Sequence, residues 1–216
     1  MTPTPVAVAR VQSPGEEIAN TVSHGLGAAV GAVGLVVMVV AAAVEGDPFK
    51  IVGGAVHGAS AVLLFLASTV YHAVRRPRAK EVLRIVDHVA IHGLIAGTYT
   101  PFALVTLRGP WGWSVLGTVW GLALFGMVFE ALFLDRFPKL STGLYLATGW
   151  VGVFALGPLL AALPAPAFAW LVAGGLFYTV GVVFFALDRR YHHLVWHLFV
   201  IAGAACHLVC VARYVM

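Results

Sequence analysis

The chain has 216 residues, of which 61% are hydrophobic and only 10% are charged, with a formal net charge of +4. A soluble domain carries about 25% charged residues, so this composition and a mean hydropathy of +0.94 exclude a water-soluble globular protein. The basic residues stand between apolar segments rather than on a face shared with aromatic residues, which excludes nucleic-acid binding.

The first fifteen residues differ from the rest of the chain. They contain three prolines and one basic residue, Arg10, and have no apolar core or cleavage site of the kind that a signal peptide needs. We predict a disordered N-terminal tail over residues 1–15, followed by a single transmembrane domain over residues 16–216.

Apolar segments fill that domain. They cover about residues 25–44, 50–73, 86–107, 113–134, 140–163, 167–187 and 192–215, and a helix needs about 20 apolar residues to cross a bilayer. The sequence therefore predicts an all-α, polytopic membrane protein of seven transmembrane helices. Only Pro164 and Pro166 mark the break between the fifth and sixth apolar segments. We expect Gly157-Pro158 to be able to kink the fifth helix before it ends.

The basic residues are distributed unevenly between the two sides of this arrangement. The first side collects Arg10, Arg75, Arg76, Arg78, Lys80, Arg136, Lys139, Arg189 and Arg190, and the opposite side collects Lys50, Arg108 and Arg213. Because basic loops stay in the cytoplasm, we predict that the first side of this multi-pass membrane protein is cytoplasmic. Its N-terminus is then cytoplasmic and its C-terminus lies outside.

Ionisable residues inside membrane spans are costly and usually functional, and here they converge at one depth. The second span ends on the inner side with Ser68 and His72, and the third begins there with Asp87. The seventh begins on the same side with His193 and His197, which share one helix face. The first span is preceded there by Glu16, Glu17, Asn20, Ser23 and His24.

Two histidines one helical turn apart, joined by a third from another helix, match the ligand set of a catalytic zinc site with one open position. We therefore predict that His72, His193 and His197 bind Zn²⁺. Asp87 is placed to orient or deprotonate the water that the metal activates. The alternative is that these histidines only form hydrogen bonds between helices.

We predict no role in the metal site for the other polar residues of the membrane spans. His207 lies about 15 Å beyond His197 along the helix, at 1.5 Å per residue, and is expected to be a core or pathway histidine. Glu130 is expected to be an interfacial or paired carboxylate. His57, His88 and His92 are left unassigned, and Glu16 and Glu17 have no predicted role.

Several motifs resemble one known family. They are Glu16-Glu17-Ile18-Ala19-Asn20, Ser23-His24-Gly25, Ser68-x-x-x-His72, Asp87-His88, Gly97-Thr98-Tyr99-Thr100-Pro101-Phe102 and His193-x-x-x-His197. From about Glu16 onward the chain resembles the bacterial hemolysin III (TrhA) branch of the progestin and adipoQ receptor family. The resemblance implies a multi-pass protein of the bacterial plasma (inner) membrane, with seven helices and the N-terminus inside. It implies that zinc is held by His72, His193 and His197. It also implies that Ser68 and Asp87 lie near the activated water.

The sequence is compatible with several functions. The wider superfamily includes alkaline ceramidases, so the resemblance suggests a zinc-dependent hydrolase of a lipid amide or ester that acts on membrane lipids. The main alternative is a non-enzymatic sensor or regulator of membrane fluidity in which zinc is structural. A cytolysin is disfavoured because the helices are uniformly apolar, and a transporter because the ionisable residues do not continue through the bilayer.

Overall fold

The computed structural model describes residues 10–216, and this part of the chain is helical almost throughout. Its elements are α1 (Pro14–Glu45), α2 (Pro48–Ala73), α3 (Pro77–Pro101), the π-helical turn η1 (Phe102–Thr106), α4 (Pro110–Phe133), α5 (Pro138–Gly149), the 3-10 segment η2 (Val151–Ala155), α6 (Leu156–Ala162), α7 (Ala165–Leu187) and α8 (His192–Tyr214). Seven segments of the described chain are long and apolar enough to cross a membrane, the fifth being α5, η2 and α6 together. The predicted all-α architecture is confirmed, and the described chain has seven candidate membrane spans, the number predicted.

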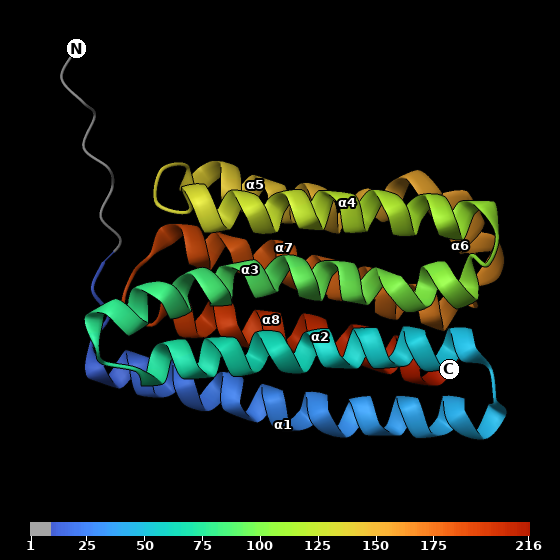
Figure 1. Cartoon of the computed structure of the whole chain (residues 1–216), viewed down its shortest axis with the longest axis horizontal. Helices are drawn as coiled ribbons and strands as arrows, with labels where there is room; N and C mark the ends of the chain where they lie inside the picture. The colour runs from blue at the N-terminus through green and yellow to red at the C-terminus, as the bar shows by residue number, and fades with distance from the viewer. Residues whose placement is uncertain (1–9) are drawn as a thin grey trace, which may run out of the picture.

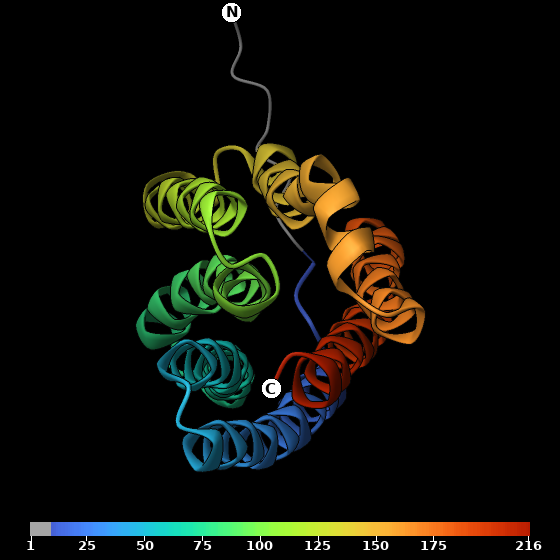
Figure 2. The ribbon, with the colours of Figure 1, turned by 90° about the vertical axis from the view of Figure 1, so that its right-hand side faces the viewer.

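The helices run up and down along the long axis of the molecule (Figure 1). Seen from one end, they follow one another around a ring in chain order, and α8 returns to lie beside α1 (Figure 2). Large apolar side chains such as Val33, Leu124 and Val183 are exposed on the outside of the ring, as expected for a surface that contacts lipid.

Alternating helix directions bring four helix ends together. The starts of α1, α3 and α8 and the end of α2 lie at the same end of the bundle, here named the histidine end and marked by Pro14, Ala73, Pro77 and His192 (Figure 1). The C-terminus lies at the opposite end. This arrangement gathers the polar residues that the sequence places at one depth.

Two helices begin earlier than the apolar segments suggest. α1 begins at Pro14 rather than near residue 25, because Ser13 and Glu16 cap it reciprocally: Glu16 N donates to Ser13 Oγ and Ser13 N donates to Glu16 Oε2. α3 begins at Pro77 rather than near residue 86, so Asp87 lies well inside the helix and not in its first turn.

The predicted N-terminal tail, residues 1–15, includes the start of α1. Its first nine residues lie outside the described part of the chain. Arg10 N donates to Asp188 Oδ2 at 3.1 Å, and Gln12 Oε1 accepts from Asn20 Nδ2 at 2.5 Å. The described residues before α1 are therefore bound to the helical domain.

The fifth span breaks at a different place from the one expected. The kink was expected at Gly157-Pro158, but the α-helix stops after Gly149, and Pro158 lies in the first turn of α6, where proline is tolerated. The cause is Tyr99 of α3. Its hydroxyl donates to Gly149 O at 2.6 Å and accepts from Gly152 N at 2.8 Å, which satisfies backbone groups that the interrupted helix leaves free.

Candidate metal centre

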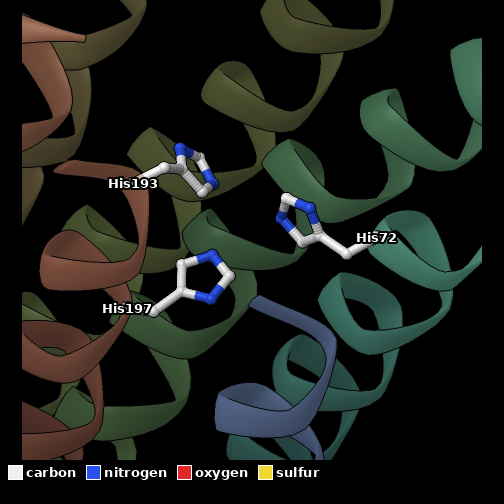
Figure 3. A group of neighbouring side chains, drawn as sticks. All are labelled: His72, His193 and His197. Atoms are coloured by element: carbon white, nitrogen blue, oxygen red, sulfur yellow. The ribbon is translucent and has the colours of Figure 1, made fainter. Parts of the chain in front are cut away.

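The three histidines predicted as ligands lie together at the histidine end. His72 is in the last turn of α2, and His193 and His197 are one turn apart at the start of α8. Their rings face a common point from two helices (Figure 3), and one nitrogen from each lies within 4.8 Å of the other two. His72 and His197 are buried, and His193 is half-buried.

This cluster can hold a metal ion. Tetrahedral zinc with nitrogen ligands at about 2.0–2.1 Å places those nitrogens about 3.3–3.4 Å apart. Small movements of the three rings would therefore bring their nitrogens to the separation that zinc requires. His72 Nε2 is buried and has no hydrogen-bond partner within residues 10–216. An unpaired buried nitrogen needs an explanation, and a metal provides one.

A carboxylate determines which nitrogen of His72 faces the cluster. Glu17 Oε2 lies 2.7 Å from His72 Nδ1, and Glu17 Oε1 lies 2.8 Å from Lys80 Nζ. A carboxylate in a salt bridge only accepts hydrogen bonds, so His72 Nδ1 carries the proton. The Nε2 lone pair is then free for a metal, as in the common carboxylate–histidine–metal arrangement.

A hydroxyl has the same effect on His197. Ser23 Oγ lies 3.2 Å from His197 Nδ1 and donates its own hydrogen to Asn20 O at 2.9 Å. Because that hydrogen is already used, Ser23 accepts a hydrogen bond from His197 Nδ1–H, and the Nε2 lone pair is free to bind a metal. The sequence placed Glu17 and Ser23 at the right depth, but nothing in it paired them with particular histidines.

Ser68 and Asp87 lie beside the cluster. Both line a cavity of about 120 Å³ that also contacts His193 and His197. Ser68 is 1% exposed and Asp87 is 8% exposed, and Ser68 Oγ has no hydrogen-bond partner in the described chain. The five residues predicted for the site therefore occupy one region.

The cavity wall is mostly apolar away from these groups. It includes Ile91, Leu94, Val182 and Phe185, and a second cavity of about 120 Å³ continues toward the opposite end of the bundle. Tyr99, Trp150 and His207 are among the residues that line both. The space beside the histidines thus extends along the bundle between apolar side chains.

Other polar residues considered in the sequence make contacts outside the three-histidine cluster. His207 Nε2 pairs with Leu171 O at 3.0 Å. Glu130 is fully buried, accepts a hydrogen bond from Ser141 and lies 3.7 Å from His92 Nε2. His88 Nδ1 lies 3.2 Å from the Tyr145 hydroxyl. Glu130 is therefore a paired carboxylate.

Comparison with known proteins gives matches over nearly the whole chain. The family model described as "Haemolysin-III related" matches residues 13–208. Hemolysin-3 of Bacillus cereus is 43% identical over 202 residues, covering 93% of this chain and 92% of the relative. The hemolysin-3 homolog of Bacillus subtilis (strain 168) is 43% identical over 200 residues, covering 92% and 94%.

A more distant relative is human. Monocyte to macrophage differentiation factor of Homo sapiens is 28% identical over 168 residues, covering 74% of this chain and 68% of that protein. No solved structure matches the chain.

Proposed function

Since the chain belongs to the haemolysin-III-related family, we propose that it is a zinc-dependent hydrolase that cleaves an amide or ester bond of a membrane lipid. The observation that carries this proposal is the three-histidine cluster beside a cavity that Ser68 and Asp87 also line. Polar groups next to apolar walls suit a lipid, whose scissile bond lies between a polar head and an acyl chain.

His72, His193 and His197 hold the zinc in this proposal. Zinc, when bound, supplies a Lewis acid that activates water and polarises the carbonyl of the substrate. Asp87 accepts the proton that the attacking water loses and returns it to the leaving nitrogen or oxygen. Ser68 donates its hydroxyl hydrogen to the carbonyl oxygen as negative charge develops there. The carbon–nitrogen or carbon–oxygen bond breaks, and the products are a fatty acid and an amine or alcohol.

We further propose that the N-terminus is cytoplasmic and the C-terminus outside, in the bacterial plasma membrane. The loop between α2 and α3 at the histidine end carries Arg75 and Arg76, and Arg189 and Arg190 lie at the same end in the turn before α8. Basic residues favour the cytoplasmic side. The metal centre then faces the inner leaflet.

A second candidate is a non-enzymatic membrane-fluidity regulator with structural zinc. It is supported by the position of the histidines, which join the end of α2 to the start of α8. A haemolytic role, which the names of two relatives suggest for those proteins, fits less well with this chain. Its described part has seven helical segments that are each long and apolar enough to remain in a membrane.

The test uses detergent-purified wild type beside the double variant His193→Ala/His197→Ala. We expect one zinc per wild-type chain by elemental analysis, lost in the variant. Fatty acid release from a panel of lipid amides and esters, followed by mass spectrometry, should occur only with the wild type. Zinc-loaded wild type that released no fatty acid from the whole panel would favour the structural role. Absence of zinc even after reconstitution would overturn both candidates.

A further inference from the structure

Helix α1 supplies none of the three clustered histidines, yet it contacts every segment that carries one. Glu17 binds His72, Ser23 binds His197, and Glu16 binds the backbone at the start of α8, two residues before His193. We propose that α1 is the positioning helix of the metal centre. Glu16, Glu17 and Ser23 act through the histidines and set how tightly and in what geometry a metal is held. This inference rests on the proposed metal site.

The Glu17 contact is restrained at both carboxylate oxygens. Lys80, from the first turn of α3, holds Oε1, and His72 occupies Oε2. With both oxygens engaged, the carboxylate has little freedom to turn away from the imidazole. Glu17 therefore fixes the ring orientation of His72 as well as its tautomer.

The Ser23 contact is restrained in the same way. Its hydrogen bond to Asn20 O fixes the hydroxyl hydrogen, so the oxygen presents lone pairs toward His197. Ser23 is buried, at 8% exposure, and water has little access to compete for the imidazole. The donor nitrogen of His197 is thus held by α1 through one specific hydrogen bond.

The third contact fixes the backbone at the start of α8. Asp188 and Tyr191 both have positive φ, at 39° and 61°, which is costly for residues other than glycine. Tyr191 N donates to Glu16 Oε1 at 2.8 Å, and Arg10 Nη1 donates to Glu16 Oε2 at 3.1 Å. Arg10 Nε also donates to Asp188 O at 3.3 Å. These contacts stabilise the strained turn from which His193 follows directly.

The experiment measures metal binding rather than catalysis. Zinc affinity of the full-length protein in detergent is determined by competition with a chromophoric chelator, and the geometry of the site from the visible absorption bands of bound Co²⁺. The variants are Glu17→Ala, Glu17→Gln and Ser23→Ala. Thr21→Val is the matched control, because Thr21 is on the same helix and its hydroxyl donates to a backbone oxygen, Glu17 O, at 2.8 Å.

Loss of a hydrogen bond to a metal-binding histidine typically weakens metal binding about 10–100-fold. We expect losses of this size for Glu17→Ala and Ser23→Ala, with shifted Co²⁺ bands. The loss should be smaller for Glu17→Gln, which keeps an acceptor oxygen, and Thr21→Val should match the wild type. Glu17→Gln and Ser23→Ala still decide the matter if Glu17→Ala does not fold.

Two contrary results are distinguishable. Wild-type affinity and an unchanged Co²⁺ spectrum in Ser23→Ala and in the Glu17 variants would overturn the positioning role and leave α1 as a packing helix. A wild type that binds neither zinc nor cobalt would instead overturn the metal site on which the inference rests.

Discussion

The imidazole ring of His24 lies flat against that of His197, with ring centroids 3.5 Å apart and planes inclined by only 11°. An imidazole binds a metal in the plane of its own ring, at about 2.0–2.1 Å for zinc. An ion in the plane of His197 is therefore too far from the nearly parallel plane of His24. His24 therefore covers the face of His197 and is not placed to be a fourth histidine ligand of the proposed metal site.

His24→Phe tests this relationship. Both ring nitrogens of His24 are buried without a hydrogen-bond partner among residues 10–216, so phenylalanine removes unpaired polar atoms and keeps the stacked ring. We expect the variant to retain one zinc per chain and a Tm equal to or above that of the wild type. Elemental analysis and a thermal melt in detergent are the measurements. Loss of zinc in this variant would show that His24 is a ligand.

Asp87→Asn separates catalysis from metal binding. Asparagine keeps the shape of the side chain but cannot accept the proton, and general-base catalysis contributes about 10²–10⁴-fold to rate. We expect fatty acid release to fall by about that factor while zinc content is unchanged. Asp135→Asn is the matched control, because the Asp135 side chain is 70% exposed and pairs with Arg84. Unchanged release by Asp87→Asn would contradict the proposed role.

Glu130→Ala should destabilise the fold without emptying the metal site. The substitution removes the acceptor of the Ser141 hydroxyl and the carboxylate beside His92. A buried polar group left unpaired costs about 1–3 kcal/mol, and each kcal/mol lowers Tm by about 2–4 °C in a protein of this size. A thermal melt beside Glu81→Ala, which changes an exposed carboxylate, measures the effect. A normal Tm with reduced zinc would instead place Glu130 in the metal site.

Gly112→Ala tests the close approach of α4 to the end of the third span. A Cβ at Gly112 would overlap the carbonyl oxygen of Ala103, whereas a Cβ at Gly117 on the same helix meets nothing within 4 Å. Overpacking costs about 1–3 kcal/mol, while alanine in an open helical position is favourable by up to about 1 kcal/mol. We therefore expect Gly112→Ala to lower Tm and Gly117→Ala to leave it unchanged or raise it. Equal melting of the two variants would contradict this packing.

The amino-acid sequence by itself determined the seven spans and one half of the candidate site. A bilayer-length apolar segment and an i, i+4 pair such as His193 and His197 are local properties, because helical periodicity relates residues within one turn. The shared depth of His72 and Asp87 followed from alternating helix directions alone. These features need no knowledge of which helices are neighbours.

Only the tertiary structure decided the remaining relationships, because they depend on which helices lie side by side around the ring. Glu17 meets His72 and Ser23 meets His197 only because α1 packs beside both α2 and α8. Likewise, the fifth span breaks after Gly149 because a hydroxyl from α3 offers its backbone an alternative hydrogen-bond partner. Contacts between distant parts of the chain produce no periodic pattern in the sequence of either part, so only the packing of the helices determines them.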